Sequence, residues 1–131
     1  MAKPILAMEK IDTACIIADD SIATFGLQRS MKQVDFCSKV IVLNDGLEAI
    51  INLQVRKKLP TIIFFDLNMP IMDGWAFLDE FKKIAGPLFQ KVHLFLMTSS
   101  IDRSDYKKVE DLGMSQLFDQ NRNLRSFGGY S

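Results

Sequence analysis

The sequence has few cysteines, no long apolar stretch and no excess of charge of either sign. Its two cysteines, Cys15 and Cys37, are too few for a disulfide framework and favour reduced thiols. Sixteen basic and sixteen acidic residues cancel, whereas nucleic-acid binders usually carry a basic excess or stripe. No run is long enough to cross a bilayer, and charged residues interrupt residues 1–11, unlike a signal peptide. These absences predict a cytoplasmic protein that neither binds nucleic acid nor inserts into a membrane.

The composition is that of one globular domain. Hydrophobic residues form 48% and charged residues 24% of the 131 residues, which leaves enough apolar material for a core. We expect a single domain over residues 1–131, with its core at about 13–125.

Short apolar runs rich in β-branched residues alternate with segments of helical periodicity. The predicted strands are residues 13–18, 39–43, 61–65, 92–97 and 116–119. The predicted helices are residues 21–33, 47–58, 75–84 and 102–112, and any last helix after residue 119 must be short. The stripe expected to face inward on the second helix consists of Leu47, Ile50, Ile51 and Val55. This alternation predicts a doubly wound α/β fold, with a parallel sheet covered by helices on both faces.

Polar side chains appear where three of these strands stop. They are Asp19 and Asp20 after the first strand, Asp66 after the third and Thr98 after the fourth. In doubly wound folds the ligand site lies beyond the carboxyl ends of the strands. Carboxylates gathered there repel each other unless a cation lies among them, and hard oxygen donors with room for water suit Mg²⁺. Such an ion would also offset negative charge when a carboxylate attacks a phosphoryl donor.

Each of these residues also has an ordinary structural interpretation. Asp19 and Asp20 could cap the helix that begins near Ser21. The hydroxyl of Thr98 could bond to backbone at a strand end. We favour the functional interpretation of the acid pair, because Asp66 places a second acidic strand end beside it.

The acid pair, Thr98 and the run Asp-Leu-Asn-Met-Pro-Ile-Met-Asp-Gly at residues 66–74 resemble the motifs of a response-regulator receiver domain of two-component signalling, of the chemotaxis-regulator type. The likeness extends from about residue 13 to residue 119 in the same element order. It implies a flavodoxin-like, five-stranded parallel sheet in the order 2-1-3-4-5. It also implies a receiver that takes a phosphoryl group from a phosphohistidine. We expect it to act as a stand-alone receiver that relays the signal by protein–protein contact, because the sequence shows no effector domain.

The resemblance implies a role for each matching residue. Asp66 corresponds to the phosphorylated aspartate, which also belongs to the Mg²⁺ ligands. Asp20 corresponds to a direct Mg²⁺ ligand, Asp19 to an acid that acts through water, and the backbone carbonyl of Asn68 to a further ligand. Thr98 corresponds to the hydroxyl that follows the phosphoryl group. The implied partners are a histidine kinase or histidine phosphotransfer protein and a downstream protein, with the chain a monomer or a phosphorylation-dependent dimer. No separate catalytic turnover is expected.

The sequence departs from this family at the end of the fifth strand. The family has Lys-Pro there, and ungapped counting places Gln120-Asn121 at that position. The lysine would pair with phosphoryl oxygens, and charge-assisted hydrogen bonds are about twice as strong as neutral ones. Two interpretations remain. Either Arg122 or Arg125 supplies the charge, or the domain is a degenerate receiver that acts as a phosphorylation-independent interaction module.

A rival of another class is a phosphatase of the haloacid dehalogenase type, which also uses an aspartate nucleophile with Mg²⁺. That family has a second Asp two residues after the nucleophile, where this sequence has Asn68, and 131 residues leave no room for a cap domain. A dinucleotide or flavin binder is disfavoured, because Asp-Asp-Ser rather than a glycine-rich loop follows the first strand.

Overall fold

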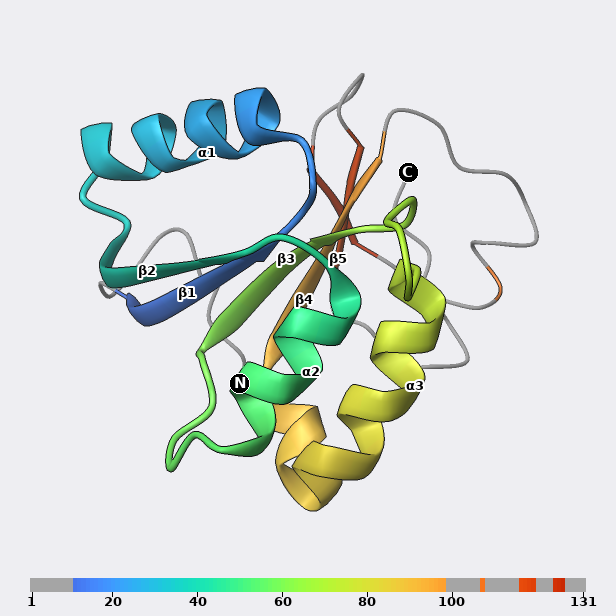
Figure 1. Cartoon of the computed structure of the whole chain (residues 1–131). Coiled ribbons are helices and arrows are strands. Elements are labelled where there is room, and N and C mark those ends of the chain that lie inside the picture. The colour runs from blue at the N-terminus through green and yellow to red at the C-terminus, as the bar shows by residue number, and fades with distance from the viewer. Residues whose placement is uncertain (1–10, 99–106, 108–115, 120–123, 127–131) are drawn as a thin grey trace.

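In the computed structural model of the chain (Figure 1), residues 11–98, 107, 116–119 and 124–126 are described, with residues 98, 116–119 and 124–126 described by their backbone alone. The strands are β1 Ile11–Ile17, β2 Cys37–Leu43, β3 Ile62–Asp66, β4 His93–Thr98, β5 Gln116–Asp119 and β6 Leu124–Ser126. The helices are α1 Ser21–Gln33, α2 Gly46–Gln54 and α3 Gly74–Ala85, followed by the 3₁₀ helix η1 Gly86–Lys91. None of the helices in the described ranges is long and apolar enough to cross a membrane.

The strands form one sheet in the order β2-β1-β3-β4-β5-β6. From β2 to β5 every neighbouring pair is parallel, so the predicted doubly wound fold and its 2-1-3-4-5 order are confirmed. The prediction was wrong at the end of the chain, where β6 pairs antiparallel with β5 in place of a short last helix. The pairing gives β5 a neighbouring strand on each side, β4 and β6, so its backbone groups have partners on both sides.

Figure 1 shows α1 on one face of the sheet and α2 and α3 on the other. Successive residues of a strand point to opposite faces, so β3 supplies both cores: Phe65 packs with α2 and α3, and Phe64 packs on the α1 side. The ring of Phe65 lies 6.0 Å from that of Phe77, which stacks on Phe81 at 5.6 Å. Burial on both faces explains why the strand is apolar until its last residue, Asp66.

α1 occupies the predicted residues, whereas α2 turns a different face inward from the one predicted. Its buried residues are Gly46, Ala49, Ile50 and Leu53. Three residues of the predicted inward stripe are exposed instead, Leu47 by 39%, Ile51 by 58% and Val55 by 79%. The buried face contains the small residues of the helix, which allow close approach to its neighbours. A Cβ atom at Gly46 would lie only 2.6 Å from the carbonyl oxygen of Met72.

The helix predicted at residues 102–112 lies outside the described residues apart from Lys107, which is helical and exposed. The other boundaries differ from the predictions by a few residues. β1 and β2 begin two residues earlier than expected, and α2 ends four residues earlier, at Gln54.

Candidate functional site

The candidate site lies at the edge of the sheet where the parallel strands end. Phe65 of β3 pairs with Ile17 of β1, and Asp66 pairs with Met97 of β4. The acids at residues 19–20 follow β1 directly, so they reach the same edge as Asp66. The chain runs from β1 outward to β2 and then returns to β3 on the other side of β1. This reversal of the strand order is the switch point at which doubly wound folds bind ligands.

Asp66 is a half-buried carboxyl group with a raised pKa. Burial is the main cause, since it disfavours the charged form, and the negative charges of Asp19 and Asp20 also raise the pKa. The backbone N–H groups of Asn68 and Leu67 oppose this shift. The structure therefore places Asp66 within electrostatic reach of Asp19 and Asp20. An excess of negative charge lies at the end of the central strand.

Asp20 caps helix α1. Its Oδ1 atom accepts hydrogen bonds from the backbone N–H groups of Ile22 at 3.0 Å and Ala23 at 3.2 Å. The structural interpretation of this residue is thus confirmed. It does not exclude the functional one, because Oδ2 makes no hydrogen bond with any described residue. A carboxylate can cap a helix with one oxygen and bind a cation with the other.

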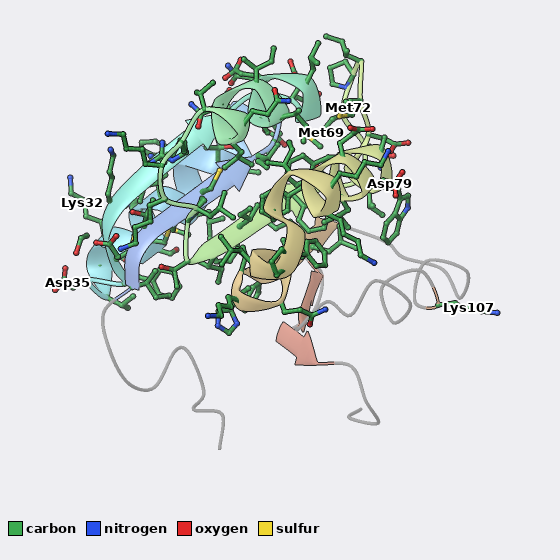
Figure 2. All side chains as sticks on the ribbon, turned by 90° about the horizontal axis from the view of Figure 1, so that it is seen from below. Lys32, Asp35, Met69, Met72, Asp79 and Lys107 are labelled. Atoms are coloured by element: carbon green, nitrogen blue, oxygen red, sulfur yellow. The ribbon has the colours of Figure 1, made fainter. Side chains whose placement is uncertain are left out.

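The loop between β3 and α3 is held closely against the sheet edge. Leu67 and Met69 are buried, so the exposed Asn68 between them is anchored on both sides. Figure 2 shows Met69 and Met72 on this loop, beside the beginning of α3. The N–H group of Gly74 donates to the carbonyl oxygen of Leu67 at 2.8 Å, which closes the loop. The backbone beside Asp66 is therefore preorganised.

Two glycines, Gly46 and Gly74, allow the close packing around this loop. A Cβ atom at Gly74 would lie 2.5 Å from the carbonyl oxygen of Asp66, and one at Gly46 would lie 2.6 Å from that of Met72. Both glycines open a helix directly after an aspartate that caps it, Asp45 or Asp73. The pairs Asp45-Gly46 and Asp73-Gly74 are the local signal for this arrangement in the sequence. They do not predict the close approach itself, because the segments that meet are distant in the chain.

The donor chemistry at this edge fits Mg²⁺. Asp20, Asp66 and the backbone carbonyl of Asn68 offer hard oxygen atoms where negative charge is in excess. Within the described part of the chain, no group of three or more His, Cys, Asp or Glu side chains is arranged to hold a metal ion. Mg²⁺ does not require such a group, because it keeps several waters and binds through one or two carboxylates plus phosphate.

The remaining predicted residues are only partly located. Thr98 is the last residue of β4 and pairs with Asp119, the last residue of β5. Its backbone thus lies one residue beyond Met97, the partner of Asp66, but its side chain is outside the described residues. Gln120, Arg122 and the side chain of Arg125 are also outside them. The source of positive charge near the site therefore stays a prediction.

Comparison with known proteins agrees with this arrangement. The family model of the response regulator receiver domain matches residues 14–123. The chain is 28% identical over 116 residues to the response regulator Rcp1 of Synechocystis, a match that covers 84% of this chain and 78% of Rcp1. It is 32% identical over 72 residues to the sensor histidine kinase CheAY of Helicobacter pylori, covering 55% of this chain and 9% of that kinase.

Solved structures show the same fold. A two component response regulator from Cytophaga hutchinsonii is 28% identical, with a TM-score of 0.77 and coverage of 86% of this chain and 87% of the other. The receiver domain of the histidine kinase CKI1 from Arabidopsis thaliana, solved in complex with Mg²⁺ and BeF₃⁻, has a TM-score of 0.73 at 19% identity. That match covers 84% of this chain and 81% of the CKI1 chain, and at this identity it supports the fold alone.

Proposed function

Since the chain belongs to the response regulator receiver family, we propose that it accepts a phosphoryl group on Asp66 from a phosphohistidine in a Mg²⁺-dependent reaction. The donor would be a histidine kinase or a histidine phosphotransfer protein. The observation that carries the proposal is the place of Asp66, half-buried at the end of β3 and near enough to Asp19 and Asp20 for their charges to raise its pKa. The signal would then pass to a downstream protein by direct contact, as in a stand-alone regulator.

In the proposed reaction an ionised oxygen of Asp66 attacks the phosphorus atom, and the bond between phosphorus and the imidazole nitrogen breaks. The electron pair of that bond stays on the imidazole, which takes up a proton from water, and an acyl phosphate forms on Asp66. Bound Mg²⁺ would supply positive charge opposite the phosphoryl oxygens. Because Asp66 is itself the acceptor, we propose no turnover of a separate substrate.

The other residues of the site would position the reacting groups. Oδ2 of Asp20 and the backbone carbonyl of Asn68 would bind the ion, with Asp19 acting through water. The anchored loop would keep the carboxylate of Asp66 in place for attack, since such preorganisation avoids the cost of ordering groups during the reaction.

The surface of α1 next to the acids suits a protein donor. Ile22 is 84% exposed and Phe25 is 65% exposed, and both follow Asp20 within two turns of the helix. An amphipathic helix can lay its apolar face against such residues. We propose that the donor docks here, with its phosphohistidine directed at the sheet edge.

The second candidate function is an interaction module that takes no phosphoryl group. Gln120, at the position of the family's lysine, favours it. The decisive experiment is intact mass spectrometry after incubation with acetyl phosphate, with and without Mg²⁺. We expect one phosphoryl addition that needs Mg²⁺ and is lost in Asp66→Asn. No addition at any Mg²⁺ concentration would leave the interaction module.

A matched pair of variants separates the two roles of Asp20. Asn caps helices as well as Asp does, so Asp20→Asn should keep the stability of α1 while removing the charge. Asp45 caps α2 through a 2.8 Å hydrogen bond from the N–H group of Glu48, and Asp45→Asn is the control. Mg²⁺ affinity, followed by the fluorescence of Trp75, the single tryptophan, should fall only in Asp20→Asn. Equal affinities in both variants would show that Asp20 is a cap alone.

A further inference from the structure

Helix α2 carries an apolar stripe on its outer side, which we define as Leu47, Ile51 and Val55. These side chains are 39%, 58% and 79% exposed, respectively. Single exposed apolar residues are common on proteins, but residues four apart on a helix are neighbours on its surface. The three therefore form one continuous strip along the helix. The opposite side of α2 is already buried against the sheet and α3.

The two ends of this stripe have opposite charge. Asp45 and Glu48 lie at the amino-terminal end of α2. Lys57 and Lys58 follow its carboxyl-terminal end, and both are exposed. Lys58 already has a partner in Asp12, with 3.4 Å between the nitrogen and oxygen atoms. Lys57 makes no ion pair with the residues that the structure describes.

We propose that the α2 stripe is the contact surface for a second copy of this chain, with the two helices antiparallel about a two-fold axis. In such a pair the same patch serves both copies. Ile51, in the middle of the stripe, would face its symmetry mate, and Leu47 of each copy would meet Val55 of the other. The antiparallel direction brings Glu48 of one copy to Lys57 of its partner. A parallel pair would instead place like charges together.

This inference goes beyond phosphoryl transfer and does not depend on it. α2 and α1 lie on opposite faces of the sheet (Figure 1), so pairing through α2 leaves Ile22 and Phe25 uncovered. One helix face is also a small interface, at the low end of the sizes seen in transient complexes. The pair should therefore be weak, dissociate on dilution and form without Mg²⁺ or phosphorylation.

Sedimentation velocity of the full chain over a range of concentrations tests the proposal. We expect the average sedimentation coefficient of the wild type to rise with concentration. Ile51→Glu should abolish this rise, because two carboxylates would meet at the two-fold axis. Val34→Glu is the matched control, since Val34 follows α1 and is 71% exposed, and it should associate like the wild type. Circular dichroism confirms that both variants fold.

An exchange of charges tests the antiparallel direction. Glu48→Lys and Lys57→Glu should each associate less than the wild type, because like charges would face each other in each homodimer. An equimolar mixture should regain association, since every facing pair in the mixed dimer is then opposite in sign. A wild type that stays monomeric at all concentrations overturns the proposal. An equal loss of association in Val34→Glu, or no recovery in the mixture, also overturns it.

Discussion

Replacing Gly74 by alanine should disturb the backbone that carries the phosphoryl acceptor. Gly74 is the first residue of α3, and its N–H group donates to the carbonyl oxygen of Leu67. An added Cβ atom would lie 2.5 Å from the carbonyl oxygen of Asp66 and 2.9 Å from Cα of Leu67. Ordinary contacts begin at 3.4 Å, so the backbone of Asp66 must move by about 3.4 − 2.5 = 0.9 Å.

The expected cost follows from this displacement. Overpacking costs about 1–3 kcal/mol, and we expect about 3 kcal/mol here because both neighbours are backbone atoms that cannot rotate away. For a domain of this size, such a loss lowers the melting temperature by roughly 10 °C. A misplacement of about 1 Å in a reacting group can slow a reaction by about 10²-fold. Phosphorylation of Asp66 should slow to a similar extent.

Gly26→Ala provides the same chemical change without the clash. Gly26 lies inside α1, and nothing would come within 4 Å of a Cβ atom there. This variant should be more stable than the wild type by about 0.5–1 kcal/mol, because alanine favours the helix. The assays are thermal denaturation by circular dichroism and the phosphorylation rate from intact mass with acetyl phosphate. If Gly74→Ala melts and reacts like the wild type, the packing argument is wrong.

Three further predictions concern Asp66, Ile71 and the two cysteines. Burial raises the pKa of Asp66 above its ordinary 3.8. Between pH 3.8 and this raised pKa, the folded state holds a proton that the unfolded state releases, so the free energy of unfolding falls as the pH rises through this range. Asp66→Asn should therefore be more stable than the wild type at neutral pH, with a difference in urea denaturation that vanishes below pH 3.8. Ile71 is 78% exposed at the centre of a tight turn, with φ of 71°, a strained conformation for a β-branched residue. Ile71→Asn should raise the free energy of unfolding by about 1 kcal/mol. A lower melting temperature would show that the contacts of the isoleucine side chain stabilise the fold by more than the backbone strain destabilises it. Burial raises the pKa of Cys15 to about 12, so only the thiol of Cys37 should react with a thiol reagent in the folded protein. Both thiols should react in denaturant, and rapid reaction of both in the folded protein would contradict the prediction.

Much of the fold and of the site was predictable from neighbours along the chain. The four apolar residues that precede Asp66 predict a strand buried on both faces, and their side chains fill the two cores. Acids placed directly after apolar strands predict a charged edge in a parallel sheet, and the raised pKa of Asp66 reflects that edge. These features could be read because strand length, alternation and the direction of parallel strands are local properties.

The sequence by itself thus determined the order of strands and helices and the edge at which Asp19, Asp20 and Asp66 gather. Tertiary structure decided which face of α2 is buried, since both faces carry apolar residues and only the small residues at Gly46 and Ala49 permit close packing. It also decided that the chain returns as β6 and that Asp20 caps α1. The physical reason is the same in each case. Close approach between segments depends on shape in three dimensions, and spacing along the chain does not record it.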